Sequence, residues 1–336
     1  MNFTHSGRPC VGLVEDGVVF GLDDGIRIVD LLGDDHAEQL RAAGDRARTH
    51  PSVTLDLAQA DLLAPIPAPP TIRDYMTFEQ HVAGVARLAD EDSVVPEQWY
   101  KAPAFYFTNP YAVVGPYAPV AVPPGCELFD FELEVAAVVG RAGRDVAVAE
   151  ADSHIAGYMV MNDWSARDLQ FAEMQVRLGP VKGKDSATSL GPFFVTADEL
   201  EPYRAGNAFD LRMTVTVNDA VVGEDNWSNM AFSYAQMLSY ASRGTEVRPG
   251  DILGSGTCGS GCLAEIWGRR GRSALPPLHP GDVVALEVDL LGRQRSTIVA
   301  STANVPISEF RALGIRAGAV PGRRADHSPT SADGNA

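Results

Sequence analysis

The hydrophobic pattern of the chain predicts a mainly β protein. Near the start, CVGLVEDGVVFGLDDGIRIVDLL contains short β-branched runs broken by Asp-Gly pairs at 16–17 and 24–25, which are strong turn signals. Later, DLRMTVTVNDAVVGEDNW alternates on both sides of Asn218-Asp219 and predicts a hairpin. PLHPGDVVALEVDLLGRQRSTIV predicts two more strands that turn at Leu291-Gly292. We therefore expect an α+β fold of mixed or antiparallel sheets rolled into a β-sandwich, with few helices.

Composition shifts along the chain predict its domains. The prolines of LLAPIPAPP mark a boundary, so we expect a small N-terminal β domain over residues 1–66 and a larger domain over 67–318. The last residues, 319–336, are small and polar, and we expect a disordered tail there.

Three segments have the features of helices. They are residues 34–50, a segment that starts near Thr77, and AFSYAQMLSYASRG, which Gly244 ends. The glycine-rich DILGSGTCGSG is followed by CLAEIW, whose apolar residues alternate like those of a strand. The glycines formally match GxGxxG, but we expect no long helix after them and find no acidic residue about 20 positions on. We reject a dinucleotide site and expect these glycines to let the backbone pass close to a ligand.

Carboxylates interrupt the most apolar part of the chain. Asp130, Glu132 and Glu134 lie two apart in FDFELEVAAVVG, so in a strand they project from one face. A second apolar run, residues 157–161, leads to Asp163. Like charges on a half-apolar strand are costly to desolvate, and hard divalent cations prefer carboxylate oxygens. The pattern indicates a metal site; a solvated polar face on an edge strand is the alternative.

Composition and charge exclude several classes of protein. The 336 residues are 45% hydrophobic, yet no run of about 18 apolar residues is present, so we expect no membrane span. We find no signal-peptide pattern and expect a cytoplasmic protein. The net charge of −17 argues against nucleic-acid binding. The four cysteines lack a zinc-binding pattern, and we expect reduced, packed thiols.

Three motifs resemble those of a known family. FELE, MNDWSARDLQ and GKDSATSLGP are similar to the core of the fumarylacetoacetase family, metal-dependent enzymes that act on 1,3-diketo and 2-oxo acids. The resemblance extends over roughly residues 65–305 and implies the family's catalytic-domain fold.

The resemblance also implies site residues. It implies a divalent ion, Mg²⁺ with Mn²⁺ or Ca²⁺ as alternatives, held by Asp74, Glu132, Glu134 and Asp163. It implies His81 as general base with Glu265 as its partner, and Lys184 as a group that stabilises or protonates the leaving carbanion. In many shorter relatives the partner glutamate follows the histidine by three residues; that position here is Gly84, so the partner must come from elsewhere. The implied substrate contacts are Arg167, Gln170, Tyr106, Thr257 and Thr188.

Alternatives remain for several of these residues. Arg167 is otherwise explained by a structural salt bridge, for example with Asp168, and Tyr106 by core packing. Met76 and Met174 stand where fumarylacetoacetase has two pocket tyrosines, which leaves the substrate open.

The leading prediction is a metal-dependent hydrolase that cleaves a C–C bond of a 1,3-diketo acid, such as an acylpyruvate or a fumarylacetoacetate-like compound. The alternatives are a decarboxylase, isomerase or hydratase of 2-oxo acids, or a non-catalytic binding module stabilised by metal. The resemblance also implies a homodimer.

Overall fold

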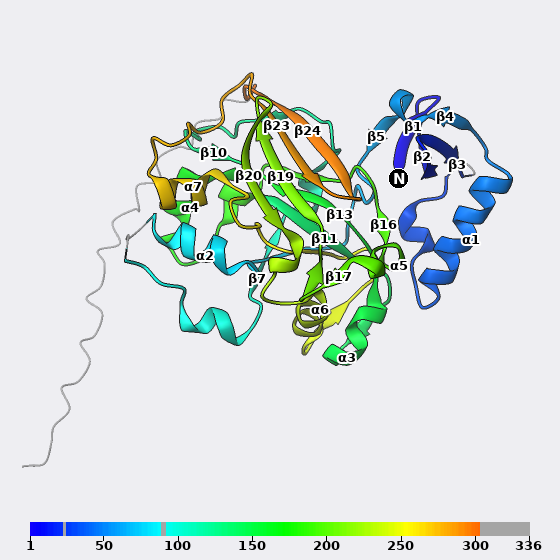
Figure 1. The fold of residues 1–336 in the computed structure, drawn as a ribbon, viewed down its shortest axis with the longest axis horizontal. Helices are drawn as coiled ribbons and strands as arrows, with labels where there is room; N and C mark the ends of the chain where they lie inside the picture. The colour runs from blue at the N-terminus through cyan, green and yellow to red at the C-terminus, as the bar shows by residue number, and fades with distance from the viewer. Residues whose placement is uncertain (23–24, 89–91, 303–336) are drawn as a thin grey trace, which may run out of the picture. The chain divides into compact units, whose positions relative to one another are not determined.

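The computed structural model describes residues 1–22, 25–88 and 92–302 (Figure 1). The tail expected at 319–336, the end of the larger domain and Asp24 of the second Asp-Gly turn lie outside the described residues. The division into domains at residue 66 stays a prediction.

The first part of the chain forms an antiparallel sheet with the order β4-β3-β2-β1-β5. Asp16 and Gly17 both have positive φ and turn β2 into β3, as expected. The sheet comprises β1 (Asn2–His5), β2 (Arg8–Glu15), β3 (Val18–Gly21), β4 (Thr54–Asp56) and β5 (Asp61–Leu63).

A mixed eight-stranded sheet carries most of the acidic residues singled out above. Its order is β7-β6-β22-β11-β13-β15-β8, with β16 pairing β13, and the β22–β6 and β15–β8 pairs are parallel. The strands are β6 (Ile72–Tyr75), β7 (Phe105–Thr108), β8 (Val113–Val114), β11 (Leu133–Val139), β13 (Ile155–Asp163), β15 (Thr188–Leu190), β16 (Val195–Thr196) and β22 (Ile252–Gly254).

A further five-stranded sheet, with the order β20-β19-β23-β24-β9, packs over the eight-stranded sheet. Figure 1 shows β19, β20, β23 and β24 side by side over β11 and β13, and β13 contacts both β23 and β24. The strands are β9 (Val120–Ala121), β19 (Arg212–Val217), β20 (Ala220–Asn226), β23 (Val283–Val288) and β24 (Gly292–Val299). Three two-stranded pairs complete the strands: β10 (Phe129–Asp130) with β14 (Ser165–Ala166), β12 (Gly143–Arg144) with β21 (Glu246–Val247), and β17 (Arg204–Ala205) with β18 (Ala208–Phe209).

The helices are short apart from the first. They are α1 (His36–Thr49), α2 (Glu79–Ala86), α3 (Val148–Ala151), α4 (Arg167–Met174), α5 (Ala197–Leu200), α6 (Tyr234–Ser242) and α7 (Leu263–Arg270). None of the helices in the described ranges is long and apolar enough to cross a lipid bilayer. The mainly β, α+β class expected from the pattern is confirmed, as are the predicted hairpin at Asn218-Asp219 and the helix ended by Gly244.

The acidic strand is buried on both faces, which corrects the expectation of a half-polar strand. It is also divided: Phe129–Asp130 belongs to β10 and the main strand, β11, begins at Leu133. The expected alternation holds, because Leu133, Val135 and Ala137 pack in one hydrophobic cluster and Ala136 and Val138 in another. β11 lies between β22 and β13, so the alternative of a solvated edge strand is wrong.

The segment CLAEIW is not a strand, contrary to our expectation. Leu263–Arg270 forms α7, and Cys262 is its N-cap residue. Apolar residues two apart fit a strand, but they fit a buried helical segment equally well. The first five residues of α7, Leu263–Trp267, are all buried. The N-terminus of α7 is no phosphate site, because the Asp130 carboxylate already accepts hydrogen bonds there from the amides of Leu263 (2.7 Å) and Ala264 (3.0 Å).

Candidate active site

Three strands of the large sheet bring four carboxylates together. Asp74 comes from β6, Glu134 from β11 and Asp163 from the end of β13, while Glu132 lies just before β11. One oxygen of each residue lies within 4.8 Å of the others, and all four side chains are buried. Gly254 on β22 makes room for them, since a Cβ there would lie 2.8 Å from Oδ1 of Asp74 and 3.0 Å from Oε2 of Glu134.

Three of these carboxylates keep an oxygen without a hydrogen-bond partner. The atoms are Asp74 Oδ1, Glu134 Oε1 and Asp163 Oδ1, each buried. Burial, and then the Asp163 carboxylate, raises the pKa of Asp74 to about 8. Burial and the Asp74 carboxylate likewise raise the pKa of Glu134 well above its usual value. Unpartnered carboxylate oxygens in a dry cluster are the donor set that a hard divalent cation binds, so the residues fit such an ion.

The balance of buried charge leads to the same conclusion. Two cations, Lys184 and Arg167, face five buried carboxylates: the four of the cluster and Asp130. If all ionise, three negative charges remain uncompensated in the interior, which is strongly unfavourable. A divalent cation would reduce that excess to one.

Lys184 and Tyr106 hold the cluster together. Lys184, at the end of η6 (Val181–Lys184), donates to Oε2 of Glu132 and to Oδ2 of Asp163 at 2.7 Å. Burial opposes the charge of Lys184, but Asp163 and Glu132 hold its pKa above the usual value. The hydroxyl of Tyr106 lies within hydrogen-bond distance of Oδ2 of Asp74 (2.8 Å) and of Oδ2 of Asp163, and it donates its single proton to one of the two. Tyr106 therefore contacts the acidic cluster itself.

Arg167 links the cluster to the start of α7. Its guanidinium donates to Asp130 (2.8 Å), to Glu132 (2.6 Å) and to the side chain of Gln170 (3.0 Å). Burial opposes ionisation of Glu132, yet Arg167 and Lys184 hold the pKa of Glu132 below its usual range. The structural salt bridge considered for Arg167 thus exists, with Asp130 and Glu132; Asp168 instead accepts from the amide of Glu127.

The structure brings His81 and Glu265 together from two packed helices. His81 lies on α2 and Glu265 on α7, with 3.6 Å between Nδ1 and Oε2, longer than a hydrogen bond. Glu265 accepts from the Ser260 amide at 2.7 Å, from Gln80 at 3.2 Å and from Arg269 at 3.0 Å. Burial opposes its ionisation, but His81 and the Ser260 amide hold the pKa of Glu265 below the usual value.

The remaining predicted substrate contacts lie around the cluster. Thr188 pairs with Asp163 across β15 and β13, and its buried hydroxyl has no hydrogen-bond partner. Thr257 is buried in the turn before α7, and Gln170 lies on α4. Met76 and Met174 are 42% and 49% exposed, so the two positions that depart from the family pattern face solvent.

Sequence reasoning missed three residues of this region. Asp130 was part of the acidic pattern, but its contacts with Arg167 and α7 were not foreseen. Arg269 was not singled out as a site residue, yet its guanidinium donates to the Glu265 carboxylate at 3.0 Å. Cys262 was interpreted as a packed thiol, and its Sγ lies 3.7 Å from Nδ1 of His81. Only the position of Cys262 and Arg269 on the helix that carries Glu265 could have revealed them, and that segment was predicted to be a strand.

Comparison with known proteins identifies the family. Residues 71–299 match the family described as fumarylacetoacetate (FAA) hydrolase C-terminal, so the chain belongs to the fumarylacetoacetate hydrolase family. Fumarylacetoacetase of Homo sapiens is 31% identical over 246 residues, which cover 60% of this chain and 58% of the human protein. The chain therefore spans less than two thirds of the length of that relative.

Solved structures show the same fold. A probable 2-hydroxyhepta-2,4-diene-1,7-dioate isomerase from Mycobacterium abscessus superimposes with a TM-score of 0.68 at 22% identity, over 90% of this chain and 98% of the other. Fumarylacetoacetate hydrolase from Exiguobacterium antarcticum gives 0.67 at 22% identity, over 89% and 98%. The resemblance deduced from the motifs is confirmed, and relatives named as hydrolases and as isomerases share this fold.

Proposed function

We propose that the protein is a divalent-metal-dependent hydrolase that cleaves a C–C bond of a 1,3-diketo acid, an acylpyruvate or a fumarylacetoacetate-like compound. The observation that carries the proposal is the position of His81 between Glu265 and the carboxylate cluster. A binding module stabilised by metal would need only the carboxylates, whereas a buried histidine with an acidic partner serves general base catalysis. The names of the relatives, fumarylacetoacetase and fumarylacetoacetate hydrolase, favour the same reaction.

We propose Mg²⁺ as the ion, with Mn²⁺ or Ca²⁺ as alternatives, held by Asp74, Glu132, Glu134 and Asp163. Bound there, the ion would act as a Lewis acid toward the oxygens of the substrate. The four carboxylates supply hard oxygen ligands, which suit these three ions.

The protein's own groups would move the protons. His81 takes a proton from the water that attacks one carbonyl, and Glu265 stabilises the imidazolium that results. Lys184 has three N–H groups and uses two on Glu132 and Asp163, so the third is free to stabilise negative charge on the leaving fragment or to protonate it. Arg167 and Gln170 would bind a substrate carboxylate, and Tyr106, Thr188 and Thr257 would orient the substrate.

The alternative is a decarboxylase, isomerase or hydratase of a 2-oxo acid at the same site, which the name of the M. abscessus relative, an isomerase, favours. Decarboxylation needs the cation but no activated water. Hydrolysis and decarboxylation therefore depend differently on His81.

Substitution of His81 tests the proposal. His81→Gln should slow hydrolysis of an acylpyruvate roughly a hundredfold to ten-thousandfold and leave cation affinity nearly unchanged. Glu265→Gln should also slow hydrolysis. Any oxaloacetate decarboxylation should survive both changes and vanish in Asp163→Ala. His36→Gln changes another buried histidine, on α1, and is the matched control. Hydrolysis by His81→Gln at the parent rate would show that His81 is not the general base and would overturn this mechanism, whereas a parent protein that decarboxylates oxaloacetate but does not hydrolyse acylpyruvates would favour the alternative.

A further inference from the structure

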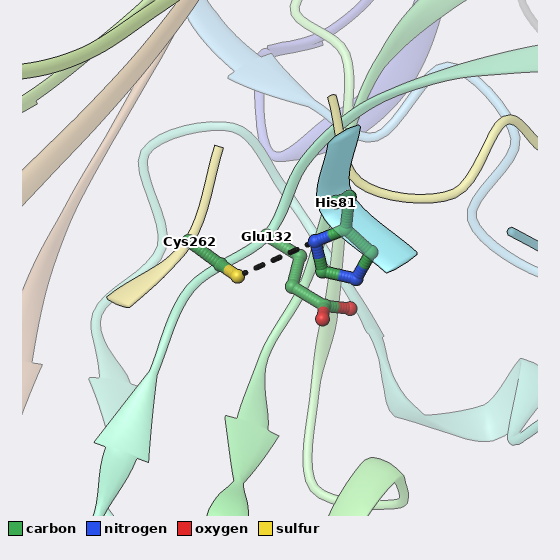
Figure 2. Close-up of side chains that lie close together, drawn as sticks. All are labelled: His81, Glu132 and Cys262. Carbon is green, nitrogen blue, oxygen red and sulfur yellow. Dashed lines mark hydrogen bonds between the residues drawn. The ribbon is translucent and has the colours of Figure 1, made fainter. Parts of the chain in front are cut away.

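A second group of metal-ligating side chains lies beside the carboxylate cluster. Figure 2 shows Cys262, Glu132 and His81 close together, with the carboxylate of Glu132 beside the imidazole ring. Sγ of Cys262 lies 3.7 Å from Nδ1 of His81, and one ligand atom of each of the three residues lies within 4.8 Å of the others. All three side chains are buried.

The need to cap α7 does not explain a sulfur atom here. Cys262 is the N-cap residue of the helix, and its Sγ accepts a hydrogen bond from the amide of Glu265 at 3.4 Å. Serine caps helices well with its hydroxyl, so capping alone would be served by oxygen. The thiol adds a soft ligand next to an imidazole, a pair that prefers zinc-like ions over Mg²⁺ or Ca²⁺.

The distance between the two ligand atoms suits a tetrahedral ion. With Zn–S of about 2.3 Å and Zn–N of about 2.0–2.1 Å, tetrahedral angles place sulfur and nitrogen roughly 3.6 Å apart. The separation of 3.7 Å therefore needs almost no movement of Cys262 or His81. Neighbouring ligands of such an ion lie about 3.3–3.6 Å apart, so the Glu132 oxygen, which lies within 4.8 Å of the other two ligand atoms, must move closer to join them.

We propose that His81, Cys262 and Glu132 form a second cation site, selective for Zn²⁺ and similar thiophilic ions, whose occupation switches the enzyme off. Binding releases the thiol proton of Cys262 to solvent and forms bonds from the ion to Sγ, to Nδ1 and to a Glu132 oxygen. No oxidant or reductant is needed. A fourth position stays open to water.

Inhibition follows from the nitrogen that the ion takes, and this step rests on the proposed role of His81. With Nδ1 bound to zinc, the ring proton lies on Nε2, so the imidazole donates there and cannot accept a proton from water. The ion also draws Glu132 away from the carboxylate cluster. Zinc at this site and Mg²⁺ among the four carboxylates should therefore weaken each other's binding.

Cobalt spectroscopy tests the site without any assay of activity. Protein held in excess Mg²⁺ is titrated with Co²⁺, whose bond to a thiolate gives a charge-transfer band in the near ultraviolet. We expect the band in the parent and in Cys258→Ser, a matched control that changes another buried cysteine of the same turn. We expect it to be absent from Cys262→Ser, which keeps a capping hydroxyl. No band in the parent, or an equal band in Cys262→Ser, would overturn the proposal.

Two further measurements keep the test valid if Cys262→Ser does not fold or if the proposed reaction is wrong. Anomalous scattering at the zinc edge, from parent crystals soaked in Zn²⁺ and Mg²⁺, should place zinc between Sγ and the imidazole; zinc only among the four carboxylates would refute the site. Zinc inhibition, compared with each protein's own zinc-free rate, should weaken at least about tenfold in Cys262→Ser and not in Cys258→Ser. Cobalt binding without acylpyruvate hydrolysis would refute the proposed function and leave the site intact.

Discussion

A Cβ on Gly84 would lie 2.3 Å from Cγ of Glu265. In the shorter relatives mentioned above, a glutamate stands at this position, three residues after the histidine. Here the position is a glycine, which has no side chain, and the carboxylate comes from α7 instead. Gly268 completes the close approach, because a Cβ there would lie 2.0 Å from the carbonyl oxygen of Gly84. α2 and α7 thus pack closely at Gly84 and Gly268, and this packing brings Glu265 of α7 beside His81 of α2.

The first prediction concerns that contact. Gly84→Ala should destabilise the fold by about 1–3 kcal/mol through overpacking and displace Glu265, so hydrolysis should fall more than cation affinity does. Gly44→Ala is the control: Gly44 lies on α1 with only Arg48 Nη1 at 4.0 Å, and alanine there should stabilise by about 0.5–1 kcal/mol. Urea unfolding and a rate assay measure both effects. A Gly84→Ala protein as stable and as active as the parent would refute the packing argument.

The second prediction concerns the carboxylate cluster. Removing divalent ions with a chelator should abolish activity, and Mg²⁺ or Mn²⁺ should restore it. Glu132→Ala, Glu134→Ala and Asp163→Ala should each lose Mn²⁺ binding in calorimetry, while Glu246→Gln, which changes an exposed residue of β21, should not. Saturating ion at one hundred times its dissociation constant should stabilise the parent by about 2.7 kcal/mol. Full activity in protein shown to be metal-free by elemental analysis would contradict the assignment.

The third prediction is a pH dependence that the ion should remove. Burial and Asp163 raise the pKa of Asp74 to about 8, so the metal-free folded state binds a proton that the unfolded state releases near the ordinary pKa of 3.8. The resulting stability is complete below that lower value and is lost as pH rises toward 8. Metal-free protein should therefore melt at a lower temperature at pH 8 than at pH 5, and Mn²⁺ should reduce the difference.

Binding of the ion should also release protons. Calorimetry at pH 6 in two buffers of different ionisation enthalpy should give different apparent heats for Mn²⁺ binding. Asp74→Asn should reduce this difference. Equal heats in the two buffers would show that the carboxylates are already ionised without the ion.

The fourth prediction is a homodimer. Exposed apolar side chains such as Tyr111 (96%), Val176 (68%) and Leu178 (80%) supply surface that a partner could cover. Light scattering across the micromolar range should give twice the mass of the chain. A monomer throughout that range would rule the dimer out.

The sequence by itself determined the class of fold, the family and the acidic residues. Alternating runs and turn signals are local, so they sufficed for the hairpin at Asn218-Asp219 and for the turn at Asp16-Gly17. The strand containing Glu134 and the strand ending at Asp163 were also recognisable, because apolar runs that end in a carboxylate are local features. The motifs around these residues gave the family.

Only the tertiary structure decided how these parts meet. Local alternation could not distinguish a strand from a short buried helix. For this reason α7, which carries Glu265 and is capped by Cys262, was predicted to be a strand. The contacts of Arg167 with Asp130, and of Tyr106 with Asp74, join segments more than 30 residues apart. Such contacts depend on the packing of sheet against helix, because the low dielectric of the interior fixes which charge must lie beside which.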